Sequence, residues 1–262
     1  MVNLKQISMY KIRTVLLVSI LFLCCTSFSE NTASFKDDQL RHIRVQDAFD
    51  MYEIDLQVRM LLKGIDENKL EIYIRAFKQE QTVEVWGKNS GDEAFQMLGD
   101  YKFCNFSGRL GPKREQGDKQ IPEGFYHLSK FNPESKFHLS LKLNYPNASD
   151  SILGNKNNYG GLIFIHGGCA TIGCVPITDE KISELYVLAV MAKDAGQTSI
   201  PIHVFPARFN KANILSLEKS DYDRSTKDFW KTMHRAYTYF EQQAKLPEIW
   251  VDDEGKYRYK IN

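Results

Sequence analysis

Short segments in which apolar and polar residues alternate recur through the middle of the chain, and no other feature constrains the fold as strongly. Alternation puts every second side chain on the same face, which is typical of a β-strand with one buried face. The segments expected to form such strands are residues 70–78, 81–87, 137–143 and 200–205, of which the first two form a hairpin. Residues 162–165 are apolar throughout and predict a central buried strand.

Segments with helical spacing lie on both sides of these strands. Apolar residues recur at roughly helical spacing over residues 46–62, which predicts an N-terminal helical arm ending near Gly64. A second helix is expected from Thr178 to about Gly196, and a closing amphipathic helix over residues 223–245, whose aromatic stripe we interpret as core. Strands in the middle with helices around them predict a mostly β fold of the α+β class.

The N-terminus has the pattern of a secretory signal peptide. Basic residues precede the apolar run 15–25, and small residues follow it. We therefore expect a signal peptide over residues 1–29 and a mature chain that begins at Glu30. Retention of the segment as an anchor is the alternative. A lipid on Cys24 or Cys25 is less favoured, because bulky residues stand where a lipobox needs small ones.

Composition excludes some classes of partner. The chain has 262 residues and a formal net charge of +1, so there is no bulk electrostatic case for binding nucleic acid. Outside the N-terminus no stretch approaches the length of a membrane span. We therefore expect no stable membrane insertion once the signal peptide is removed.

Three cysteines remain after signal cleavage, namely Cys104, Cys169 and Cys174. An odd number in an oxidising compartment indicates one disulfide and one free thiol, or free thiols throughout. Cys169 could pair with Cys174, or Cys104 with Cys169, which would leave Cys174 free. The connectivity cannot be read from the sequence.

The segment from residue 163 to residue 178 carries the clearest chemical pattern. It places His166 at the end of a buried strand and then passes through three glycines to Cys174, just before a helix. A cysteine nucleophile needs a base and donors for an oxyanion. His166 can take the thiol proton, and the backbone amides near Gly173 and Cys174 can point at the oxyanion, each donor contributing roughly 3–4 kcal/mol to lowering the barrier.

A zinc site is the competing interpretation of the same residues. His166, Cys169 and Cys174 could supply three ligands, but no fourth ligand is evident and the spacing fits no ordinary zinc finger. We predict no metal and no cofactor.

The same segment resembles the active-site signature of the L,D-transpeptidase family, the YkuD-type catalytic domain. That family has a strand ending in His-Gly and then a Ser/Thr-x-Gly-Cys element, which correspond here to His166-Gly167 and Thr171-Ile172-Gly173-Cys174. The resemblance covers most of the mature chain and is closest to the YafK-like branch. Further matching stretches are residues 73–78, 107–113, 116–118, 122–126, 138–141, 144–147, 201–208, 229–230 and 246–247.

The chain departs from the broader family in three ways. Ile172 stands where the family usually has a second histidine, which leaves His166 as the base. Val175 and Pro176 stand where a polar or basic residue, often arginine, is usual. The gap between the histidine and the cysteine is also short.

The resemblance implies a β-rich L,D-transpeptidase catalytic domain over residues 70–206, with a helical arm at residues 30–69 and a helical extension at residues 207–262. It implies an exported, periplasmic enzyme of the cell envelope that acts on peptidoglycan stem peptides through a thioester. The alternative is a hydrolase of the same fold, an amidase or carboxypeptidase that cleaves peptidoglycan peptides or protein–peptidoglycan links. In either case a wall-linked envelope protein is a possible partner. A non-catalytic wall-binding module is less favoured, because both Cys174 and His166 are present.

Four residues are candidates for binding substrate. Arg109 and Lys113 lie on a glycine-rich loop, where they could hold a peptide carboxylate or simply be solvated charges. Tyr145 precedes a proline in a turn and could line the cleft, and Gly167 adjoins His166. His138 is expected in the core or behind the site, and His203 is expected to be structural.

Overall fold

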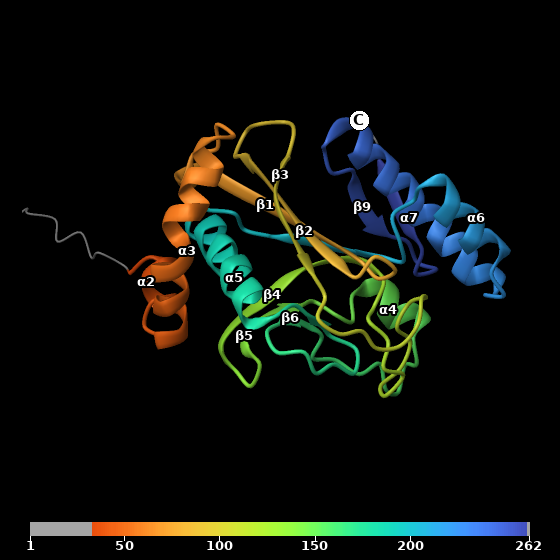
Figure 1. Cartoon of the computed structure of the whole chain (residues 1–262). Helices are drawn as coiled ribbons and strands as arrows, with labels where there is room; N and C mark the ends of the chain where they lie inside the picture. Colours follow the sequence, from red (N-terminus) through yellow and green to blue (C-terminus); the bar gives the residue numbers. More distant parts are fainter. Residues whose placement is uncertain (1–32, 261–262) are drawn as a thin grey trace, which may run out of the picture. The chain divides into compact units, whose positions relative to one another are not determined.

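An eight-stranded sheet forms the centre of the protein, and helices cover both of its faces (Figure 1). The computed structural model describes residues 33–260. The helices are α2 (Phe35–Gln39), α3 (Ile43–Leu61), the short 3-10 helix η1 (Glu67–Lys69), α4 (Ala148–Leu153), α5 (Asp179–Asp194), α6 (Lys211–Lys219) and α7 (Arg224–Gln243). The strands are β1 (Leu70–Phe77), β2 (Thr82–Asn89), β3 (Gln96–Lys102), β4 (Gly124–Ser135), β5 (His138–Leu143), β6 (Phe164–His166), β7 (Val175–Pro176), β8 (Pro201–Phe205), β9 (Glu248–Val251) and β10 (Tyr257–Lys260).

The order of strands in the large sheet is β3-β2-β1-β8-β4-β5-β6-β7, and β9 pairs with β10 in a separate two-stranded sheet. Strands β1 and β2 form the predicted antiparallel hairpin. Strand β8 lies between β1, to which it is parallel, and β4, to which it is antiparallel. The prediction of a mostly β α+β fold with flanking helices is therefore confirmed.

Alternation along β1 explains why both faces of the sheet are covered. Ile72, Ile74 and Ala76 point into the core that includes α5, whereas Phe77 belongs to a second core that includes residues of α6 and α7. Helix α5 is buried from Ile182 through Ala192, because the sheet lies on one side of it and α2 and α3 on the other (Figure 1). Helix α7 buries one stripe, which confirms the interpretation of its aromatic residues as core.

Two features of the sheet differ from the sequence expectation. The apolar run 162–165 yields only the short strand β6, which lies next to the edge strand β7 and not at the centre. Ile165 and His166 are buried because β5, β7 and α5 pack around β6, not because strands extend far on both sides. The C-terminal segment also holds the β9–β10 hairpin, which the helical pattern did not predict.

The predicted signal peptide lies outside the described residues. Among residues 33–260, none of the helices is long and apolar enough to cross a bilayer.

Candidate active site

His166 ends β6, and Cys174 directly precedes the neighbouring strand β7 at one edge of the sheet. Strands β6 and β7 are parallel, with Ile165 opposite Val175 and His166 opposite Pro176. Cys174 comes directly before β7, so the two-residue period of a strand puts its side chain on the same face as those of Pro176 and His166. The register thus places Cys174 two residues before the position opposite His166.

The loop that carries the thiol is held by Thr171. The amides of Gly173 and Cys174 both donate to Thr171 Oγ1, at 3.2 and 2.9 Å, and the Thr171 hydroxyl donates to the Cys174 carbonyl at 2.8 Å. Gly173 has φ +135°, and a Cβ there would lie 2.9 Å from the Gln120 carbonyl oxygen, so only glycine fits. The two amides expected to bind an oxyanion are therefore engaged by Thr171 in this state.

His166 is held in one tautomer. Its side chain is buried, its ring stacks on Phe137 with centroids 4.6 Å apart, and its Nδ1 lies 2.5 Å from the Gly167 carbonyl oxygen. A carbonyl oxygen only accepts hydrogen bonds, so Nδ1 carries the proton and Nε2 keeps its lone pair. A neutral histidine with a free Nε2 can act as a general base.

The surroundings favour the neutral forms of both groups. Burial raises the pKa of the half-buried Cys174 thiol, although a backbone contact at Phe164 and the charge of Lys113 act in the opposite direction. Burial also lowers the pKa of His166, while its bond to the Gly167 carbonyl works against that. The thiol itself donates to the Leu162 carbonyl at 3.5 Å. The pair therefore rests as thiol and imidazole, and proton transfer accompanies the attack.

The described cysteines divide into one disulfide and one free thiol. Cys104 and Cys169 are bonded, with Cα atoms 5.4 Å apart, and Cys174 is free. The pairing answers the question that the sequence left open and excludes a Cys169–Cys174 disulfide. Because Cys169 is bonded to Cys104, it is not a thiolate ligand for zinc beside His166 and Cys174.

Lys113 lies close enough to Cys174 to affect its titration, but it is not a free surface cation. The side chain is buried, it pairs with Asp118, and it donates to the Glu115 carbonyl at 2.7 Å. Asp118 also accepts from the amides of Arg114 and Gln120, at 3.1 and 3.0 Å. Burial raises the pKa of Asp118, but these hydrogen bonds hold it below its usual value. Asp118 thus organises the loop that carries Lys113, a role that the sequence did not reveal.

The other three candidates for substrate binding differ in exposure. Arg109 is exposed, and its guanidinium lies over the ring of Tyr222, with Cζ 5.3 Å from the centroid. Tyr145 is buried, donates to the Tyr159 carbonyl at 2.9 Å, and lies below Lys113, whose Nζ is 6.0 Å from the ring centroid. Gly167 is tightly packed, because a Cβ there would lie 2.4 Å from Asp179 Oδ1.

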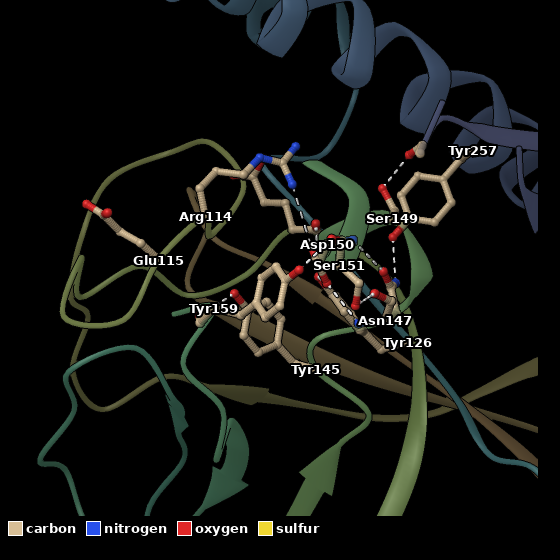
Figure 2. A network of polar contacts seen from close by, with 12 residues as sticks. Arg114, Glu115, Tyr126, Tyr145, Asn147, Ser149, Asp150, Ser151, Tyr159 and Tyr257 are labelled. Atoms are coloured by element: carbon tan, nitrogen blue, oxygen red, sulfur yellow. Dashed lines mark hydrogen bonds and ion pairs between the residues drawn. The ribbon is translucent and has the colours of Figure 1, made fainter. Parts of the chain in front are cut away.

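A polar network includes Arg114, the residue that follows Lys113 (Figure 2). Its centre is the buried carboxylate of Asp150, which accepts from Tyr126 at 3.0 Å and pairs with Arg114 at 3.6 Å. Burial raises the pKa of Asp150 to about 6, although hydrogen bonds and Arg114 oppose this. Asn147, at the start of α4, donates to Tyr257 of the C-terminal hairpin at 2.7 Å (Figure 2).

Two other histidines take supporting positions. His138, the first residue of β5, lies 2.8 Å from Ser183 Oγ through its Nε2. His203 is buried beside Tyr73, whose hydroxyl lies 2.9 Å from its Nδ1. Burial, followed by the charge of Arg75, lowers the pKa of His203 to about 3, which agrees with the expected structural role.

Comparison with known proteins gives close sequence relatives. No family model matches the chain. The chain is 36% identical over 188 residues to the protein named "Putative L,D-transpeptidase YafK" of Escherichia coli (strain K12), and the match covers 71% of this chain and 72% of that protein. The protein of the same name from Escherichia coli O157:H7 matches equally.

Solved structures with detectable similarity are more distant. The helical cell shape determining protein Pgp2 from Campylobacter jejuni has a TM-score of 0.43 and 16% identity, covering 71% of this chain and 74% of that one. Bd1075 of Bdellovibrio bacteriovorus has a TM-score of 0.39 and 18% identity, covering 70% and 77%. Both TM-scores lie below 0.5, so these similarities carry no inference about this chain.

Proposed function

The chain belongs to the L,D-transpeptidase family that includes YafK, and from this premise we propose that it is an exported enzyme in which Cys174 transfers acyl groups of peptidoglycan stem peptides through a thioester. The observation that carries the proposal is the free, half-buried thiol of Cys174 directly before the strand that pairs with His166, whose Nδ1 is engaged by the Gly167 carbonyl so that Nε2 is left as the base. The substrate class is inferred from the family, and the chemistry is inferred from Cys174 and His166.

The reaction proceeds in two halves. Cys174 Sγ attacks a peptide carbonyl while Nε2 of His166 takes the thiol proton, and a tetrahedral oxyanion forms. Its collapse breaks the carbon–nitrogen bond, and the leaving amine takes the proton back from His166. The thioester is then attacked by an acceptor amine, which gives transpeptidation, or by water, which gives hydrolysis.

The backbone amides of Gly173 and Cys174 are the donors that stabilise the oxyanion. Because both now donate to Thr171 Oγ1, substrate has to displace or share that acceptor. The same Thr171 oxygen donates to the Cys174 carbonyl, so its displacement from the amides also breaks that hydrogen bond. The exposed guanidinium of Arg109 is the group available to hold a stem-peptide carboxylate.

Mass spectrometry of purified muropeptides incubated with the protein tests the proposal. We expect an acyl-enzyme mass on Cys174, crosslinked or exchanged products when an amine acceptor is added, and loss of all products in Cys174→Ser. If products form equally in Cys174→Ser, the nucleophile is assigned wrongly. Products of hydrolysis alone, with acceptor present in excess, would instead identify an amidase or carboxypeptidase on the same cysteine.

Export is proposed from the sequence pattern of residues 1–29. N-terminal sequencing of the protein recovered from the cell envelope should give a chain beginning near Glu30. A retained N-terminus, or a lipid on Cys24 or Cys25, would contradict it.

A further inference from the structure

Four charged side chains, three of them buried and the fourth, Asp118, largely so, form two ion pairs near the loop that carries Lys113. Lys78 and Glu123 form an ion pair at 3.0 Å, and neither side chain is exposed at all. Lys113 and Asp118 form the second pair, with side chains 5% and 15% exposed. Burial lowers the pKa of Lys78, whereas the charges of Glu123 and Asp118 raise it, so the two pairs act on each other.

Glu123 fixes the backbone of the loop that leads to Lys113. One carboxylate oxygen accepts from the Gly111 amide at 2.6 Å, while Lys78 Nζ donates to the Gly111 carbonyl at 2.8 Å. Both polar groups of the Gly111 backbone are therefore held by buried charged side chains, two residues before Lys113. Hydrogen bonds to charged groups contribute more than neutral ones and restrict geometry.

The second oxygen of Glu123 is held from the C-terminal segment. Trp230 of α7 donates its indole N–H to this oxygen at 2.7 Å, and both residues are buried. Trp230 also packs against Tyr222, with ring centroids 4.9 Å apart, and Tyr222 is the platform on which Arg109 rests. One buried tryptophan thus supports Arg109 and, through Glu123, the stretch that carries Lys113.

The loop that contains Lys113 and Gln120 lies next to the segment that carries Cys174. Lys113 lies near enough to Cys174 to favour its thiolate. The Gln120 carbonyl packs against Gly173, so closely that a Cβ on Gly173 would lie 2.9 Å away. A displacement of this loop therefore changes both the charge beside the thiol and the space around it.

We propose that Trp230 and Glu123 are positioning residues of the acyl-transfer site, so that α7 completes the active site and is not a separable extension. The inference rests on the proposed function, in which Cys174 is the nucleophile and Arg109 holds substrate. Trp230 acts through Glu123 on Lys113, and through Tyr222 on Arg109.

The test compares Trp230→Phe with the matched control Trp250→Phe, since the Trp250 side chain is 48% exposed on β9. The rate of iodoacetamide labelling of Cys174 is measured from pH 6 to pH 10 on the full mature chain, with the thermal midpoint as a check of folding. We expect Trp230→Phe to label about three- to tenfold more slowly at pH 7 and to show a profile displaced upward, because one pKa unit is tenfold in thiolate. Trp250→Phe should match the wild type. An unchanged profile in a folded Trp230→Phe overturns the inference.

A second variant tests the Arg109 branch separately, and Glu123→Gln, which keeps the shape of the side chain but removes its charge, replaces Trp230→Phe in the labelling test if that variant does not fold. Tyr222→Ala removes the platform of Arg109 but keeps both partners of the Trp230–Glu123 hydrogen bond, so KM for the muropeptide should rise several-fold and by more than kcat falls. An unchanged KM overturns the Arg109 branch of the inference. Failure of the proposed function is a different result, in which the wild type itself forms no products from muropeptides.

Discussion

The disulfide between Cys104 and Cys169 should be a major source of stability without being part of the chemistry. It joins residues 65 apart in sequence, and Cys104 lies beside β7, where its amide donates to the Pro176 carbonyl at 3.0 Å. Closing a loop of that length removes conformational freedom from the unfolded chain. The chain-entropy relation gives about 4 kcal/mol at 25 °C for this loop, which is an upper figure.

Equilibrium unfolding in urea measures this contribution. The double variant Cys104→Ala/Cys169→Ala is compared with the wild type, and the wild type is also measured with and without reductant. With a denaturant slope of about 2–3 kcal/mol/M for a chain of this size, the midpoint should fall by roughly 1–2 M. The same change should follow when the wild type is reduced.

Activity separates the two kinds of cysteine. Cys169→Ser should keep turnover at temperatures where it stays folded, whereas Cys174→Ser should abolish turnover with little change in the unfolding midpoint. Equal midpoints for the oxidised and reduced wild type, or three titratable thiols in the native mature chain, would refute the disulfide. A dead Cys169→Ser beside an active Cys174→Ser would reverse the assignment of the nucleophile.

Three further substitutions test the geometry of the site and its support. His166→Ala should slow acylation of Cys174 by roughly 10²–10⁴-fold, the usual contribution of general acid–base catalysis, in single-turnover measurements with His127→Ala as the exposed control. Gly173→Ala should destabilise the protein by about 1–3 kcal/mol and suppress labelling of Cys174, because of its φ of +135° and the nearby carbonyl, whereas Gly161→Ala has open space and should do neither. The pKa of Asp150 is raised to about 6, so the native state binds its proton more tightly than the unfolded chain, and this contribution to stability is present below about pH 4 and lost as pH rises through 6. Asp150→Asn should flatten that part of the stability–pH curve, and an identical curve would contradict the assignment.

The sequence predicts where the helices and strands of this fold lie better than it predicts which strands pair with one another. Alternation correctly gave the β1–β2 hairpin, and helical spacing gave α3 and α7. The spacing of apolar residues along the chain gives no information about the order of strands in a sheet. The apolar run 162–165 therefore predicted a central strand, although β6 lies next to the edge, and the true central strand β8 looked like the last one. The strands of the β9–β10 hairpin have four residues each, which is too short for an alternating pattern to be recognised in the sequence.

The proposed catalytic residues could be predicted from the sequence for a different reason. His166 and Cys174 follow a local motif whose glycines and strand ends fix their relation over only nine residues. The partners of the site come from far away in the chain. Asp118 beside Lys113, Phe137 against His166 and Trp230 against Glu123 depend on tertiary contacts that no spacing encodes. The same holds for the choice of Cys104 as the partner of Cys169.

The position of β8 has a consequence for the order in which the chain can fold. Strands β1–β3 form one contiguous half of the sheet and β4–β7 the other, and β8 is the strand that joins the two halves. A chain that emerges N-terminus first from a ribosome or a translocation channel presents both halves, with the edges of β1 and β4 unpaired, until residue 205 is free. Unpaired edges invite association with other chains. The sheet therefore closes only after about three quarters of the chain has emerged, and the two halves are exposed to aggregation during that interval.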